Sequence, residues 1–134
     1  MIETKIAHIG LNCIDPEITE CYYQKHFGFV RAKQIDINGR RLIFLKNGEI
    51  RLELFQVDGA LPDENRDGPT NTGFRHIAFQ VDDIDAKLLE MGADVKVTMG
   101  PYDLSDHING WKVVWVRDPD GRIVEISQGY EDDF

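Results

Sequence analysis

An internal repeat constrains this chain more than any other feature. Residues 8–15 read His-Ile-Gly-Leu-Asn-Cys-Ile-Asp, and residues 76–83 read His-Ile-Ala-Phe-Gln-Val-Asp-Asp. Each half then places a glutamate inside an apolar run, Glu53 in the first half and Glu125 in the second. The repeat length of roughly 70 residues is too long for a solenoid unit. It predicts a duplicated supersecondary module.

Each half predicts a strand, a helix and three further strands. Asp15 and Pro16 are typical of a helix start, and Gly28 of a helix end. The helix is expected to carry Ile18, Cys21, Tyr22 and Lys25 on one side. The turns Asn38-Gly39 and Asn47-Gly48 indicate hairpins. The expected strands are 5–13, 30–37, 40–46, 49–57, 74–81, 94–99, 111–117 and 122–128, and the expected helices are 16–26 and 84–91.

This order predicts an α+β fold in a single domain, residues 1–134. Module 1 spans about residues 4–57, a linker about 58–72, and module 2 about 73–130. Two βαβββ modules would form curved mixed sheets around a cleft, with helices outside. Residues 101–110 are expected to form a second long loop.

Strand alternation predicts which side chains share a face, because successive side chains point to opposite faces. His8 and His76 each fall on the small or polar face of their strand, opposite an apolar face. Glu53 and Glu125 are flanked by large apolar residues, so they should lie opposite that apolar layer. A buried carboxylate without a partner costs several kcal/mol, and a cation would remove that cost.

Two imidazoles and two carboxylates suit one divalent ion among Ni²⁺, Zn²⁺, Co²⁺, Fe²⁺ and Mn²⁺. A lone His or Glu in a strand is more often an ordinary core or surface residue, but four in register within a repeat favour a site. We therefore predict a cleft that binds one metal ion through His8, Glu53, His76 and Glu125. The other two histidines fall outside the repeat and are predicted to be surface residues: His26 and His107.

The formal net charge of −9 disfavours nucleic acid and anionic membranes as partners. No apolar run approaches the roughly 20 residues of a membrane helix, and the N-terminus lacks a signal-peptide pattern. Cys13 and Cys21 are expected to be reduced and buried. The default location is the cytoplasm, and the expected partner is a small-molecule substrate.

The two strand starts and residues 118–126, Asp-Pro-Asp-Gly-Arg-Ile-Val-Glu-Ile, resemble the vicinal oxygen chelate superfamily. This superfamily includes glyoxalase I, methylmalonyl-CoA epimerase, extradiol dioxygenases, fosfomycin-resistance proteins and bleomycin-binding proteins. The resemblance covers nearly the whole chain and implies that the four metal-ligand positions fall on His8, Glu53, His76 and Glu125. A Glu at the second position resembles glyoxalase I. The epimerases tend to have Gln there, and the dioxygenases use a His-His-Glu triad.

Asn12 marks a departure from glyoxalase I, which resembles His-Thr-Met-Leu-Arg-Val here and uses the Arg to hold the glutathione carboxylate. A neutral amide cannot replace a charged bidentate clamp, so the resemblance does not imply glutathione use. Trp111 falls near the place where that family often has a Lys. Arg75 could supply an alternative anion contact or be an exposed strand-end charge. The substrate-pocket candidates are Asn12, Gln80, Trp111 and Arg75.

The resemblance favours a metal-dependent lyase or isomerase of the glyoxalase I type, similar to lactoylglutathione lyase. A small substrate would chelate the ion through vicinal oxygens, and Glu53 or Glu125 would act as the base that yields an enediolate. One alternative is an Fe(II)-dependent dioxygenase, against which Glu53 counts because it would occupy a position needed for oxygen. The other is a non-enzymatic, antibiotic-binding module whose aromatic slot, or simply sheet core, includes Trp111, Trp115, Phe44 and Tyr102.

The resemblance also implies a homodimer. In that arrangement, His8 and Glu53 of one chain could meet His76 and Glu125 of the other. Strand alternation fits an intrachain site and a shared site equally well.

Overall fold

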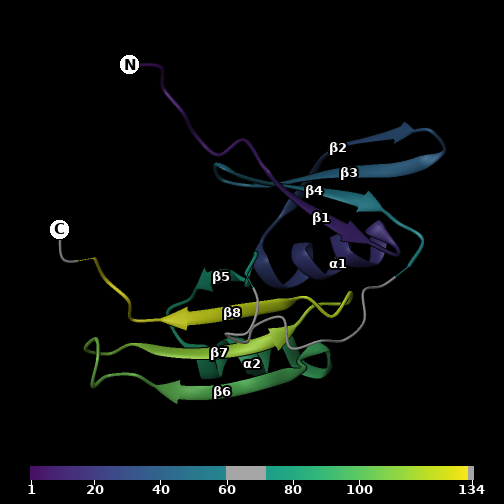
Figure 1. Ribbon diagram of the computed structural model, residues 1–134. Helices are drawn as coiled ribbons and strands as arrows, with labels where there is room; N and C mark the ends of the chain where they lie inside the picture. The colour runs from purple at the N-terminus through teal and green to yellow at the C-terminus, as the bar shows by residue number, and fades with distance from the viewer. Residues whose placement is uncertain (60–71, 133–134) are drawn as a thin grey trace. The chain divides into compact units, whose positions relative to one another are not determined.

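The computed structural model describes residues 1–59 and 72–132 (Figure 1). The chain divides into two compact units, Met1–Pro62 and Asp63–Phe134. The division falls in the predicted linker, most of which lies outside the described residues. That the two units form one domain stays a prediction.

Unit 1 contains one helix and one four-stranded sheet (Figure 1). Its strands follow the spatial order β1-β4-β3-β2, in which β1 and β4 are parallel and the other neighbours are antiparallel. The elements are β1 (Ile9–Cys13), α1 (Pro16–Phe27), β2 (Val30–Ile37), β3 (Arg40–Asn47) and β4 (Ile50–Gln56).

Unit 2 repeats this topology with the strand order β5-β8-β7-β6, and β5 and β8 are its parallel pair. The α+β fold of two βαβββ modules is therefore confirmed. The elements are β5 (Ile77–Gln80), α2 (Ile84–Met91), a 3₁₀ turn (Gly92–Asp94), β6 (Val97–Asp103), β7 (Lys112–Arg117) and β8 (Ile123–Gln128). No helix in the described part of the chain is long and apolar enough to cross a membrane.

The ends of α1 follow from its sequence. The Asp15 carboxylate accepts a hydrogen bond from the backbone N–H of Glu17 at 3.0 Å, and Pro16 begins the helix. Gly28 ends it in a left-handed conformation (φ 72°), with its N–H bonded to the Tyr23 carbonyl. The helix contacts β3 and β4, whose inward residues are fully buried: Ile43, Leu45, Leu52 and Leu54.

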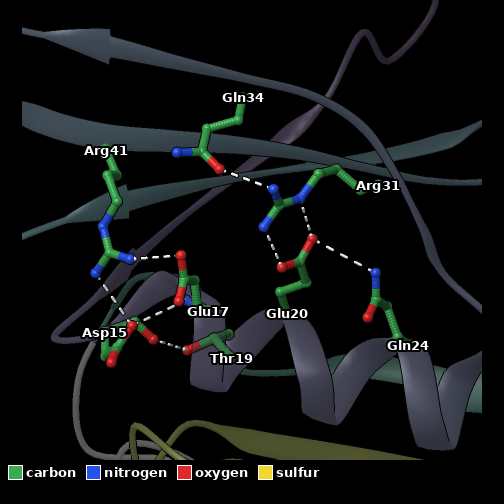
Figure 2. A network of polar contacts seen from close by, with 8 residues as sticks. All are labelled: Asp15, Glu17, Thr19, Glu20, Gln24, Arg31, Gln34 and Arg41. Carbon is green, nitrogen blue, oxygen red and sulfur yellow. Dashed lines mark hydrogen bonds and ion pairs between the residues drawn. The ribbon is translucent and has the colours of Figure 1, made fainter.

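Two arginines from the sheet hold carboxylates of the α1 region (Figure 2). Arg31 of β2 donates from Nε (2.6 Å) and Nη2 (2.5 Å) to the two carboxylate oxygens of Glu20, which is buried at 7% exposure. Arg41 of β3 contacts Asp15 at 3.2 Å and Glu17 at 2.8 Å. Bidentate pairs demand a specific geometry, so these contacts orient the helix on its sheet.

The turn before β8 is organised by the Asp118 side chain, which is fully buried. Its carboxylate accepts hydrogen bonds from the backbone N–H groups of Asp120 (2.9 Å) and Arg122 (3.0 Å), and it pairs with the Arg122 guanidinium. Aspartate suits this position because its short carboxylate can accept from backbone two residues on. The turn therefore sets where β8 begins, and so where Glu125 lies.

The prediction for His26 in α1 is wrong. His26 was expected at the surface, but it is 3% exposed and packs edge-on against Tyr22, with ring centroids 5.1 Å apart. Residues one helical turn apart share a face, and the aromatic face of α1 is the buried one. Ile18 is 57% exposed instead. Neither cysteine is in a disulfide, but only Cys13 is buried, since Cys21 is exposed.

Three strands begin three or more residues later than predicted, and one of them is β5, which begins at Ile77 rather than residue 74. Strand β1 begins at Ile9 rather than residue 5, and the strand expected at 94–99 runs from Val97 to Asp103. The 3₁₀ turn occupies the first residues of the predicted strand, so β6 begins after it. Shifts in its register with β7 let β6 continue past Gly100. There φ is +86°, and a Cβ would approach the Val113 carbonyl oxygen to 3.0 Å. Glycine therefore lets the strand enter the predicted loop.

Replacing Arg31 with Met should lower the free energy of unfolding by about 2 kcal/mol, because Glu20 would remain buried without its partner. Partial exposure of the Arg31 side chain, 39%, places this value below that for a fully buried pair. Chemical denaturation measures the change.

The matched control is Arg40→Met. Arg40 pairs with Asp58 at 2.6 Å and lowers the pKa of that carboxyl through a hydrogen bond, but both side chains are well exposed. Exposed pairs contribute little to stability, so this variant should unfold almost as the wild type does. Equal destabilisation by the two substitutions would contradict this account of Glu20.

Candidate metal centre

Unit 1 brings its predicted His and Glu together. His8 immediately precedes β1, and Glu53 lies in the middle of β4, where it is paired with Gly10 across the parallel register. His8 Nε2 is 3.2 Å from Glu53 Oε2. The Glu53 side chain is 14% exposed and the His8 side chain 45%. The pair therefore lies where a ligand can reach both groups.

Unit 2 builds the same pair from the same topology. His76 immediately precedes β5, and Glu125 lies in β8 opposite Ala78. His76 Nε2 is 3.6 Å from Glu125 Oε1, and these side chains are 20% and 14% exposed. In both units the His stands two residues before the partner of the Glu. The duplicated sequence pattern therefore corresponds to a duplicated geometry.

Alternation along the strands separates each glutamate from the helix-covered core. The neighbours of Glu53, Leu52 and Leu54, have 0% exposure, and the same holds for Val124 and Ile126 beside Glu125. Since successive side chains point to opposite faces, both carboxylates lie on the face away from that layer. This is the placement that the alternation predicted.

The chemistry of each pair fits a divalent metal. An imidazole nitrogen and a carboxylate oxygen are ordinary ligands of Zn²⁺, Mn²⁺, Ni²⁺ and related ions. Each half-buried carboxylate already faces a group that becomes cationic on protonation, and a metal ion would take that role. Among residues 1–59 and 72–132, no cluster of three or more potential metal ligands forms. That all four residues hold one ion stays a prediction.

The predicted substrate-pocket residues lie in different surroundings. Asn12, Gln80 and Arg75 are exposed. Asn12 is paired with Phe55 in the sheet of unit 1, and Gln80 with Ser127 in that of unit 2. Trp111 is half-buried, and its Nε1 donates a hydrogen bond to Ser127 Oγ at 3.1 Å. This structural contact occupies the indole N–H.

An aromatic residue stands opposite each glutamate. Phe44 is paired with Glu53 on β3, and Trp115 with Glu125 on β7. The Trp115 ring lies 6.5 Å from that of His76, edge-on, and 5.9 Å from Tyr102. From the sequence alone, these aromatic residues could line a ligand slot or belong to the sheet core. The equivalent positions of Phe44 and Trp115 in the repeat are the sequence signal that could have placed them beside the two glutamates.

His107 is exposed, as predicted, and lies in the loop between β6 and β7. The fourth histidine, His26, is a buried residue of α1. Neither competes with the His–Glu pairs as a metal-ligand candidate.

Comparison with known proteins gives several matches over nearly the full chain. The Escherichia coli protein YaeR, which is uncharacterised, is 27% identical over 131 residues, covering 92% of this chain and 95% of that protein. The virulence protein STM3117 of Salmonella typhimurium is 29% identical over 132 residues, covering 96% and 86%.

Solved structures share the fold. A glyoxalase family protein from Enterococcus faecalis superposes with a TM-score of 0.75 at 25% identity, covering 96% of this chain and all of that one. The fosfomycin resistance protein FosX from Listeria monocytogenes, solved with Mn(II), has a TM-score of 0.71 at 16% identity, covering 96% and 95%.

The family model for the glyoxalase/bleomycin resistance protein/dioxygenase superfamily matches residues 5–126. This range includes both His–Glu pairs and all eight strands except the end of β8. The chain belongs to the glyoxalase/bleomycin resistance protein/dioxygenase superfamily.

Proposed function

We propose that the chain is a metal-dependent lyase or isomerase of the glyoxalase I type that acts on a small substrate with two adjacent oxygens. The observation that carries the proposal is the pair of equivalent contacts, His8 with Glu53 and His76 with Glu125. The members of this superfamily include enzymes, and several solved relatives carry glyoxalase names. The particular reaction is our inference.

The four residues would together hold one divalent ion, from the set Ni²⁺, Zn²⁺, Co²⁺, Fe²⁺ and Mn²⁺. When bound, the ion would supply Lewis acidity toward the substrate's oxygens and acidify an adjacent C–H. The second glutamate distinguishes this set from the two-His, one-carboxylate triad of non-haem iron oxygenases. Glu53 contacts His8 as closely as Glu125 contacts His76, which supports a role for both carboxylates.

The protein's own contribution would be proton transfer. Glu53 or Glu125 would take the proton from the substrate carbon and return it to the neighbouring carbon, as a general base and then acid. Both carboxylates are only 14% exposed, so water competes weakly for them. Phe44 and Trp115, opposite the two glutamates, would shield the reacting atoms from solvent.

Removing any one ligand should weaken metal binding. Each single substitution by alanine should lower the Mn²⁺ affinity at least about tenfold, because a carboxylate or imidazole donor is lost. The four positions are His8, Glu53, His76 and Glu125. Isothermal titration of the metal-free protein measures this, and Mn²⁺ is a suitable probe given its presence in FosX.

The controls for these variants are His107→Ala and Glu49→Gln, which change an exposed His and an exposed Glu elsewhere. Both should bind Mn²⁺ as the wild type does. If the unit 2 substitutions leave the affinity unchanged while those in unit 1 abolish binding, the four-ligand proposal is wrong.

Turnover should depend on both carboxylates. Glu53→Gln and Glu125→Gln should each reduce kcat by roughly 10²–10⁴, the usual contribution of general acid–base catalysis. The assay would screen hemithioacetals against 2-acyl thioesters with the metal-loaded protein. Full activity of both variants on a substrate that the wild type converts would rule out this mechanism.

We further propose a homodimer, which the resemblance implies and no contact in the structure tests. Light scattering of the purified chain should give about twice the mass of 15.4 kDa. A monomer that binds one Mn²⁺ tightly would instead require that both His–Glu pairs of the site come from the same chain.

A further inference from the structure

The sheet of unit 1 presents its side chains in rows on the face that carries Glu53. The register of β3 and β4 sets Phe44 opposite Glu53 and Leu42 opposite Phe55. On the other side of the Phe44–Glu53 pair, Lys46 lies opposite Arg51. Since side chains two residues apart share a face, these rows lie side by side (strands labelled in Figure 1). One row is cationic, one contains the predicted metal ligand, and one is apolar.

The cationic row lacks the neutralising partners that other arginines have. Arg31, Arg40 and Arg41 each pair with a carboxylate. Lys46 and Arg51, in contrast, make no hydrogen bond or ion pair through their side chains to any residue within 1–59 and 72–132. Like charges placed directly opposite each other across two strands destabilise a sheet. A bound anion would turn this repulsion into two attractive contacts.

The cationic row also adjoins the predicted metal site. Arg51 is two residues before Glu53, a separation of roughly 7 Å along a strand. His8 immediately precedes Ile9, and Ile9 is paired with Leu52, the chain neighbour of Arg51. Arg51 is exposed and Lys46 half-buried, so both are accessible to a ligand that reaches His8 and Glu53.

On the other side of Glu53, the row is apolar. Leu42 and Phe55 are paired across β3 and β4, and Ile35 of β2 continues the row. Phe55 is 38% exposed and Ile35 36% exposed, so the row offers accessible apolar surface. A ligand lying across the three rows would meet positive charge, then the His8–Glu53 pair, then hydrocarbon.

We propose that Lys46 and Arg51 bind an anionic group of the substrate, a carboxylate or a phosphate-type group. This inference rests on the proposed function and adds the substrate class: a small anion that carries two adjacent oxygens and an apolar end. Guanidinium and ammonium groups are the donors that bind such oxygens most strongly. The overall charge of −9 does not oppose this, because the cationic row acts at short range.

The test compares two probes that differ by one phosphate group: dihydroxyacetone phosphate and dihydroxyacetone, measured by calorimetry on the Mn²⁺-loaded protein. The wild type should bind the phosphate compound about tenfold more tightly or better. In the double variant Lys46→Gln/Arg51→Gln this preference should fall to within about threefold. An equal affinity of the wild type for both probes would overturn the proposal.

Two variants separate the charge from other effects. Lys25→Gln removes one positive charge from an exposed residue of α1, across the sheet from Glu53, and should keep the full preference. The double variant Lys46→Arg/Arg51→Lys keeps both charges and should keep most of it. If the glutamine double variant retains the wild-type preference, Lys46 and Arg51 are not the anion site.

Mn²⁺ binding distinguishes failure of the proposed function from failure of the anion site. The Lys46→Gln/Arg51→Gln protein should bind Mn²⁺ at least as tightly as the wild type, since it loses only repulsive charges. If the wild type binds no Mn²⁺, the metal proposal fails and the anion site is tested with inorganic phosphate on the metal-free protein. Phosphate should then bind the wild type more tightly than the glutamine double variant, and equal binding would overturn the site.

Discussion

The parallel pairing of the first strand of each unit with its last is the constraint on which the rest depends. Without it, residues at the start of β1 and in the middle of β4 would have no reason to meet, although they are far apart in the sequence. With it, His8 reaches Glu53 and His76 reaches Glu125. A slip of one residue in either register would turn the glutamate into the helix-covered layer. Buried leucines on both sides of Glu53 make that slip costly.

Much of this could be predicted from local patterns. The Asn38-Gly39 turn has positive φ at both residues, as its composition indicates. Asp15 and Gly28 bound α1 as expected. The repeat, combined with alternation, was enough to predict the face on which each His and Glu lies, because parity along a strand depends only on residue spacing. That each His meets its Glu depends on the parallel pairing of the first and last strands. The metal-binding quartet that combines the two pairs is a further step, and it stays a prediction.

Features that depend on partners distant in the sequence were harder to predict. His26 was assigned to the surface because it falls outside the repeat, yet it packs against Tyr22 on the buried aromatic face of α1. The path of β6 depends on a glycine packed against Val113 of the next strand. Nothing in the sequence singles out Lys46 and Arg51 as a pair, since only the β3–β4 register places them opposite each other. Cross-strand register is not visible from either strand alone.

The central proposal is that the two equivalent His–Glu pairs together hold one metal ion. Titration of the metal-free protein with Mn²⁺, with free ion followed by electron paramagnetic resonance, tests it most directly because it counts ions per chain. The proposal predicts one tightly bound ion per chain, which is lost when either pair is substituted. Two weak, independent ions per chain would mean that each pair binds on its own. No bound ion would mean that the pairs are structural, and either result would contradict the account.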